Sequence, residues 1–324
     1  MRIKSADDRR PQIAQLTALL SRPDVSEATR QRIELEIRTV KAGEQGETDA
    51  AYLIEFNYGR DPDVMTLHDL RIACDGRVAQ VDHLIITRRF EFWVCESKRF
   101  SEGVEINEQG EWSAYRRGQK QGIASPIEQN KRHIAVLTDV FAKRLVTMPT
   151  RLGLRYKATL RSLVLVSDRT QITRPTGSTQ VEGLGSVIKA DQLKSTIDRF
   201  TAQRSSEERL QPNLATIVSA ATIENVARQL AALHAPTRFA WAKRFGLPEQ
   251  PSRATERSQH SSGGLGRVVF PGVSGNRRSR GRSHCESCGE TVSDAVIEYC
   301  RQYAALLEGS VLCVSCQDEF YPDR

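Results

Sequence analysis

Two carboxylates and a lysine fall within one short stretch of the sequence, where Asp82 precedes the triplet Glu96-Ser97-Lys98. Residues two apart on a β-strand project from the same face, so Glu96 and Lys98 are expected side by side. Carboxylate oxygens suit Mg²⁺, which usually takes one or two protein carboxylates and keeps several waters. A metal-bound water is a stronger nucleophile, and a lysine beside it can orient that water or offset the charge of a phosphate. The alternative is a plain surface ion pair between Glu96 and Lys98.

The surrounding sequence predicts strands that would bring these side chains together. Apolar residues alternate with polar ones over 78–87 and again over 90–95, and Arg88-Arg89 between them is short enough for a tight reversal. A further strand is predicted over 64–73, followed by the turn signal Asp75-Gly76. Strands over 64–73, 78–87 and 90–98 would then form an antiparallel meander. In that meander Asp82 comes close to Glu96.

Four motifs follow one another in order: Gly43-Glu44-Gln45-Gly46-Glu47, Gln80-Val81-Asp82-His83, Glu96-Ser97-Lys98, and Pro126-Ile127-Glu128-Gln129 followed by His133. Over about residues 40–190 this ordered set resembles the nuclease-related domain (NERD) family. That family is similar to the PD-(D/E)xK nucleases, which have a restriction-endonuclease-like fold. The chain departs from the usual proline-aspartate pair, because Val81 precedes Asp82. The resemblance implies metal-dependent nuclease chemistry, with Mg²⁺ or Mn²⁺ held by Asp82 and Glu96.

The resemblance also implies further site residues. Glu47 is either an extra carboxylate that reaches the metal or a solvated glutamate that the helix dipole favours. Its motif match implies the first role, and Glu44 is the second candidate for it. Gln129 and His133 share one face of a helix predicted from Pro126 to about residue 146. We expect Gln129 to line the site by its motif match, and His133 to be an ordinary polar helix residue.

The other elements fit a mixed sheet flanked by helices, an α/β architecture of the restriction-endonuclease-like kind. Apolar spacing predicts the following segments: helices over 11–20, 26–40 and 48–56, an edge strand over 104–107 with Trp112, strands over 159–167 and 187–190, and helices over 191–200 and 217–233. The predicted organisation is an N-terminal helical segment (1–40), a nuclease-like domain (41–202), a helical extension (203–246), a basic disordered linker (247–284) and a zinc-binding module (285–324).

Composition places the chain among soluble globular proteins, since 27% of its 324 residues are charged and 39% are hydrophobic. No apolar run of about 18 residues exists, so no membrane span is predicted. The first residues lack the apolar core of a secretory signal, so we expect a reducing cytoplasm.

The net charge of +7 is concentrated in residues 251–284. This segment holds seven arginines and one glutamate, or +6, which leaves about +1 elsewhere. Its Pro, Ser and Gly content cannot bury a core, so it is predicted to be a flexible arm for an anionic partner. We expect Arg277, Arg278, Arg280 and Arg282 to contact nucleic acid, with DNA favoured over RNA.

Two CxxC pairs mark the C-terminus, Cys285/Cys288 and Cys313/Cys316, with 24 residues between the inner cysteines. Four thiolates at such spacing suit tetrahedral Zn²⁺, and a unit this small would need the metal to fold. A redox dithiol pair or unpaired thiols are the alternatives. His284 and Cys300 are substitute ligands, and the module could bind nucleic acid or a protein partner.

Two functions from different classes fit these observations. The first is a Mg²⁺-dependent nuclease in which Asp82 and Glu96 hold the metal, Glu47 assists, Lys98 positions water or stabilises phosphate, and Gln129 completes the site. The second is a non-catalytic nucleic-acid-binding adaptor that uses the arginine arm and the zinc module. Intact Asp82, Glu96 and Lys98 favour the nuclease, because a binding scaffold does not need all three.

Overall fold

The computed structural model describes residues 1–151, 154–176, 181–210, 217–237, 239–248, 284–287, 291–292, 296–297, 300–301, 310–313 and 316. The side chains of residues 151, 154 and 204–210 are outside this description. The predicted basic linker therefore lies almost wholly outside the described residues, together with Arg277, Arg278, Arg280, Arg282 and Cys288.

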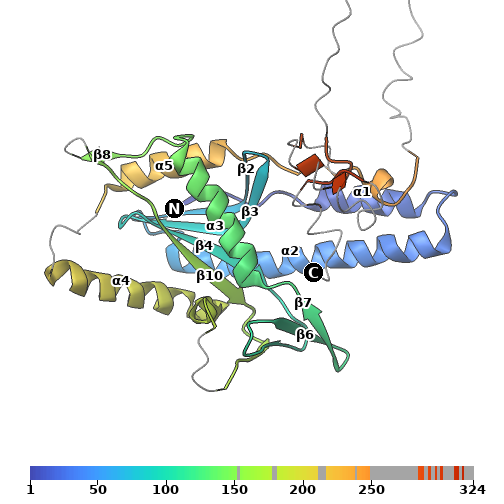
Figure 1. The fold of residues 1–324 in the computed structure, drawn as a ribbon, viewed down its shortest axis with the longest axis horizontal. Helices are drawn as coiled ribbons and strands as arrows, with labels where there is room; N and C mark the ends of the chain where they lie inside the picture. The colour runs from blue at the N-terminus through green and yellow to red at the C-terminus, as the bar shows by residue number, and fades with distance from the viewer. Residues whose placement is uncertain are drawn as a thin grey trace, which may run out of the picture.

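The N-terminal region consists of two helices packed on each other, α1 (Arg10–Leu20) and α2 (Glu27–Tyr58) (Figure 1). The prediction of separate helices over 26–40 and 48–56 is wrong, because α2 is continuous through Gly43 and Gly46. A glycine costs a helix about 1 kcal/mol relative to alanine, which packing of a long helix can offset. At Gly46 the missing side chain also has a use, since an added Cβ would lie 3.2 Å from Cβ of Arg99. Ser26 caps the start of α2, since its side chain accepts a hydrogen bond from the Thr29 amide.

A six-stranded mixed sheet in the order β1-β2-β3-β4-β10-β12 forms the centre. Its strands are β1 (Arg2–Lys4), β2 (Val64–Cys74), β3 (Arg77–Thr87), β4 (Glu91–Lys98), β10 (Thr159–Val166) and β12 (Val187–Lys189). The predicted antiparallel meander of β2, β3 and β4 is confirmed. The strands β10 and β12 add in parallel beside β4, and β1 adds in parallel beside β2.

Helices cover both faces of this sheet. On one face, α3 (Pro126–Ala142) and α5 (Ala220–Ala232) pack on the apolar side chains of β2, β3 and β4. On the other face, α2 and the start of α4 (Leu193–Leu210) pack on Ile85, Trp93 and Leu163. The α/β prediction of a mixed sheet flanked by helices is confirmed, and Figure 1 shows α3 and α2 on opposite sides of the strands.

A second, smaller sheet stands beside the first, in the order β11-β5-β6-β7. Its strands are β5 (Gly103–Ile106), β6 (Trp112–Arg116), β7 (Gln119–Ile123) and β11 (Gln171–Thr173), and a two-stranded pair is formed by β8 (Thr150–Arg151) and β9 (Leu154–Arg155). The predicted edge strand over 104–107 thus belongs to a sheet of its own. The apolar residues Val104, Ile106 and Trp112 pack there against β10 and Ile127.

The later helices differ from the predicted ones in their bounds. The helix predicted over 191–200 begins at Leu193, after a 3₁₀ turn Ala190–Gln192 that itself follows another, Leu184–Ser186. The helix predicted over 217–233 is α5, capped by Ser219, and it contributes to the same core as β2 to β4. The short helix α6 (Trp241–Arg244) packs instead against α1 and α2. Within the described ranges no helix is long and apolar enough to cross a membrane.

Candidate active site

The pairing of β3 with both of its neighbouring strands is interrupted at Asp82. On one side, β2 and β3 pair at His68 with His83 and at Leu70 with Val81, and between these pairs Asp69 has a left-handed backbone with φ of +52°. On the other side, the regular pairing of β3 with β4 ends where His83 faces Cys95. A non-glycine residue with positive φ inside a strand is costly and is concentrated at functional sites. The interruption frees the carboxylates at this level to face a common space.

The carboxylate of Asp82 is fixed by the neighbouring strand. Its Oδ2 accepts a hydrogen bond of 2.7 Å from the backbone amide of Ser97, between the other two residues of the predicted site. The strand that carries Ser97 is held in turn by β10, whose parallel pairing continues to Lys98. Asp82, Glu96 and Lys98 are therefore positioned by three neighbouring strands of the central sheet.

Glu96 and Lys98 form the ion pair expected from their spacing, with 2.7 Å between Lys98 Nζ and Glu96 Oε1. Glu96 is only 2% exposed. Its second oxygen, Oε2, is buried and accepts no hydrogen bond from the part of the chain that the structure describes. A buried carboxylate oxygen without a hydrogen bond carries a free-energy cost of desolvation, and a cation would remove that cost.

Charge repulsion is strong in this cluster. Burial raises the pKa of Asp82 well above its usual range, and the charges of Glu96 and Glu47 raise it further. The pKa of Glu47 is also raised, first by burial, with Arg9 opposing and Asp69 and Glu96 adding to the rise. Burial lowers the pKa of Lys98, but Glu96, Asp82 and Glu47 outweigh that effect and leave the pKa raised. The protonated form of Lys98 is therefore favoured in the metal-free protein. The three carboxylates therefore share one electrostatic environment.

Glu47 comes to the site from α2. It lines a cavity of about 300 Å³ together with Asp82 and Glu44. The charge effects of Glu47 on Asp82 and Lys98 place it among the site carboxylates, rather than on a solvated helix start.

The helix α3 brings His133 to the carboxylates. The helix is anchored by the buried Asn130, whose Nδ2 donates to the carbonyl oxygens of Val94 and Leu163 at 2.7 and 3.2 Å. One turn later His133 is buried, with Nδ1 3.7 Å from Oε2 of Glu96. The Gln129 side chain is half-buried and makes no hydrogen bond within the described part of the chain.

A chain of hydrogen-bonded side chains, with two buried histidines at its centre, supports Ser97 from the other direction. The Ser97 Oγ lies 2.7 Å from His83 Nε2, His83 Nδ1 lies 2.8 Å from His68 Nδ1, and His68 Nε2 lies 3.0 Å from Glu55 Oε1. Burial lowers the pKa of both imidazoles, so both are neutral. Burial raises the pKa of Glu55, but hydrogen bonds from Thr66 and His68 leave it lowered, so Glu55 is an acceptor. With one proton on each imidazole, His68 donates to Glu55, His83 to His68, and Ser97 to His83.

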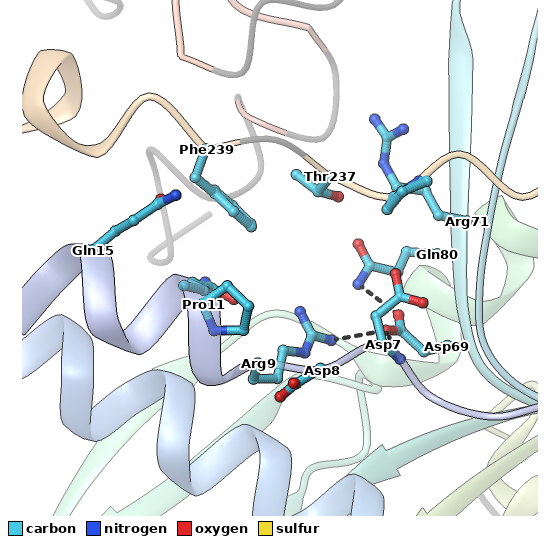
Figure 2. Close-up of a pocket in the computed structure, with 12 residues that line it drawn as sticks. Asp7, Asp8, Arg9, Pro11, Gln15, Asp69, Arg71, Gln80, Thr237 and Phe239 are labelled. Carbon is cyan, nitrogen blue, oxygen red and sulfur yellow. Dashed lines mark hydrogen bonds and ion pairs between the residues drawn. The ribbon is translucent and has the colours of Figure 1, made fainter. Parts of the chain in front are cut away.

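Sequence reasoning missed two residues of the site, Arg9 and Asp69. Arg9 Nη2 lies 3.4 Å from Glu47 Oε2. It also lies 3.5 Å from Asp69 Oδ2, a contact that Figure 2 shows. Burial lowers the pKa of Arg9, but Asp69, Glu47 and Asp82 leave it raised. A signal for Asp69 existed, because an aspartate stands there in the middle of an apolar strand. No local signal marks Arg9, which lies next to Arg10 in a polar segment far from the motifs.

The C-terminal cysteines form a second candidate metal site. The sulfur atoms of Cys285, Cys313 and Cys316 are buried and lie within 4.8 Å of one another. The fourth predicted ligand, Cys288, is outside the described residues. The Cys300 sulfur instead exchanges hydrogen bonds of 3.4 Å with the backbone of Leu312, so it supports the cluster from beside it.

Comparison with known proteins agrees with this geometry. No curated protein and no solved structure matches the chain at a significant level. A family model described as NERD, nuclease-related domain, matches residues 42–166, which include Glu47, Asp82, Glu96, Lys98 and His133. The matched segment runs from the middle of α2 to the end of β10 and so covers most of the central sheet. Residues 42–166 of this chain are therefore similar to the nuclease-related domain family.

Proposed function

We propose that this protein is a metal-dependent nuclease that hydrolyses phosphodiester bonds, in DNA rather than RNA. One observation carries the proposal: Asp82, Glu96 and Lys98 converge where the central sheet opens, and Glu47 joins them from α2. Raised carboxylate pKa values in a cavity, each with an identified charge partner, are typical of functional sites.

The residues present fit a hard divalent cation. The donors are carboxylate oxygens, and Glu96 Oε2 is buried without a hydrogen bond from the described chain. The formal charges of Glu47, Asp69, Asp82 and Glu96 against Arg9 and Lys98 are four negative and two positive, which leaves a charge of −2. In the described ranges only the three cysteines place three ligand atoms within 4.8 Å of one another, so the carboxylates are less tightly gathered. Mutual repulsion explains that spacing, and a cation such as Mg²⁺ or Mn²⁺ would relieve it.

Each residue of the site then has a distinct role. Asp82 and Glu96 would hold the cation, which when bound activates water and offsets charge on the phosphate. Lys98 is held beside Glu96 as a cation in the metal-free protein, so it can donate hydrogen bonds to the attacking water or to a phosphate oxygen. Glu47 adds negative charge from α2. The Ser97 amide keeps the Asp82 carboxylate in place between the other two groups.

The thiol cluster suits a soft cation, and we propose one Zn²⁺ per chain. Cys285, Cys313 and Cys316 supply three sulfurs, and Cys288 would be the fourth ligand by its CxxC spacing. This site has no part in the hydrolysis. With the arginine-rich arm of residues 251–284 it would add affinity for nucleic acid, or contact a protein partner.

A cleavage assay with two matched lysine variants tests the nuclease proposal. Lys98 and Lys120 each pair with a glutamate, at 2.7 and 2.8 Å, but Lys120 lies on the small sheet away from the site. Lys98→Ala should lower cleavage of linear duplex DNA in Mg²⁺ by about a hundredfold or more, and Lys120→Ala should leave it unchanged. Chelation by EDTA should stop the wild-type reaction. Wild-type protein that binds DNA but never cleaves it would support the adaptor function instead.

A further inference from the structure

The N-terminal segment supplies the acidic site with a positively charged side chain that lies outside the residues matched by the family model. Arg9 precedes α1 by one residue and lies well before residue 42, where the match to the nuclease-related domain family begins. Its side chain is only 17% exposed and contacts Glu47 and Asp69 at 3.4 and 3.5 Å. Both distances are long for an optimal charge-assisted hydrogen bond. Arg9 therefore lies in the site without being tightly bound to either carboxylate.

The backbone that carries Arg9 is fixed to the sheet. Strand β1 pairs with β2, and Lys4 Nζ donates to the carbonyl oxygens of His68 and Asp69 at 3.1 and 2.8 Å. The Asp7 amide donates to Asp69 Oδ2 at 3.2 Å, and Asp7 Oδ2 lies 3.0 Å from Nε2 of His234, just after α5. These contacts hold the residues just before Arg9 against β2 and the end of α5, so they limit where the Arg9 side chain can lie.

Arg9 lies between two cavities. One, of about 300 Å³, is the cavity lined by Glu47 and Asp82. The other, of about 330 Å³, is lined by Gln12, Gln80 and Phe239. Arg9 lines both, and Figure 2 shows its guanidinium at the base of the second cavity, pointing toward Asp69. A strand of nucleic acid lying from one space to the other would bring a phosphate to the guanidinium.

Charge counting indicates how Arg9 would behave when a divalent cation binds. Without Arg9, the group of four carboxylates and Lys98 carries −3, so Arg9 lowers the attraction for a second cation. Once a divalent cation neutralises the remaining −2, the carboxylates no longer hold Arg9 strongly. A guanidinium with its donors free is the preferred bidentate partner of a phosphate.

We propose that Arg9 is a substrate-binding residue of the site, which rests on Glu47 and Asp69 without metal and binds the substrate phosphate when metal is present. This inference rests on the proposed nuclease function. It predicts two effects of opposite sign from one substitution: loss of Arg9 should strengthen metal binding and weaken substrate binding.

The test compares Arg9→Ala with Arg10→Ala in the full-length protein. Arg10 is the adjacent arginine, is 87% exposed and pairs only with Asp8 among the described carboxylates, so it is a matched control. Mn²⁺ affinity is measured by calorimetry, and affinity for a short DNA duplex is measured in Ca²⁺ by fluorescence anisotropy. Arg9→Ala should tighten Mn²⁺ binding about three- to tenfold and weaken duplex binding about tenfold or more. Arg10→Ala should change Mn²⁺ binding less than twofold.

Arg9→Lys guards against a folding defect. It keeps the positive charge, so Mn²⁺ affinity should stay near that of wild type while duplex affinity falls, because an ammonium lacks the planar pair of donors. The inference is overturned if Arg9→Ala leaves both affinities within twofold of wild type, or if it strengthens duplex binding. Neither measurement requires turnover, so a wild-type protein that binds both ligands without cleaving DNA would refute the nuclease function alone.

Discussion

The two candidate metal sites are built in different ways. The acidic site stands on three neighbouring strands of a sheet with a large apolar core, so the fold holds Asp82 and Glu96 in place at the expense of charge repulsion. The thiol cluster belongs to a short segment, and its three cysteines, Cys285, Cys313 and Cys316, are themselves part of the small described core of that segment. The comparison indicates that the sheet creates the acidic site without metal, whereas metal would create the thiol site.

The largest effect should come from removing a carboxylate from the acidic site. Glu96→Gln keeps the shape of the side chain but removes its charge, so cation binding should weaken and cleavage should fall about a thousandfold. Steady-state cleavage in Mg²⁺ measures the loss, with Glu105→Gln on the small sheet as control. Near-normal cleavage by Glu96→Gln would mean that the reaction occurs elsewhere.

At the thiol cluster, loss of one ligand should release the metal. Protein purified without chelator should contain one zinc per chain, and Cys313→Ser should lose it, with faster amide hydrogen exchange at residues 310–313. Cys300→Ser should keep its zinc, because that sulfur bonds to the Leu312 backbone rather than joining the cluster. Elemental analysis and hydrogen-exchange mass spectrometry decide the matter. A wild-type chain without zinc would contradict the proposal.

The arginine arm should affect affinity and leave the chemical step alone. Changing Arg277, Arg278, Arg280 and Arg282 to serine removes up to four phosphate contacts, so the slope of log K against log salt should fall by up to about 3.6. At a fixed salt concentration near 0.1 M we expect DNA binding to weaken about tenfold, with kcat unchanged. Titrations at several salt concentrations test this, and an unchanged slope would show that the arm is only a spacer.

The smallest expected effect is a gain of stability at the acidic site. The folded protein holds the Asp82 proton more tightly than the unfolded chain does, because the pKa of Asp82 is raised on folding. In the metal-free protein, the contribution of Asp82 to stability is therefore fully present below the usual aspartate pKa of about 3.9. That contribution is lost as the pH rises through the pKa that Asp82 has in the folded state. Asp82→Asn removes the buried charge and keeps an oxygen for the Ser97 amide.

In EDTA at pH 8, Asp82→Asn should thus melt at a higher temperature than wild type, by about 2–4 °C for each kcal/mol recovered. The difference should disappear near pH 4. The exposed Asp198→Asn, whose partner is Lys194, should show no such gain. Scanning calorimetry of the metal-free proteins measures the shift, and a lower melting temperature for Asp82→Asn at pH 8 would show that Asp82 is not under repulsion.

The sequence was informative where periodicity and chemistry coincide. Apolar patterns located β2, β3, β4 and β10, and the expected closeness of Asp82 to the Glu96-Ser97-Lys98 triplet agrees with the hydrogen bond from the Ser97 amide to Asp82. The periodicity failed within α2, where two glycines suggested a break that tertiary packing overrides. It also could not show that residues 103–123 leave the central sheet, because strand pairing partners are not encoded by alternation.

The site was only partly predictable for a related reason. Motif residues carry a local signal, but Arg9 reaches the site through the pairing of β1 with β2, a contact between segments about 60 residues apart. The place of His133 beside Glu96 depends on how α3 is rotated about its axis. The buried hydrogen bonds of Asn130 set that rotation. The order of polar residues along the helix does not show which of them will face the sheet.

Anomalous diffraction from one crystal soaked in Mn²⁺ tests the central claim most directly, because data at the manganese and zinc edges locate both cations at once. Our account predicts a manganese peak between the carboxylates of Asp82 and Glu96 and a zinc peak among Cys285, Cys313 and Cys316. A crystal in which manganese lies away from Asp82 and Glu96, or in which these carboxylates bind no cation at millimolar Mn²⁺, would contradict it.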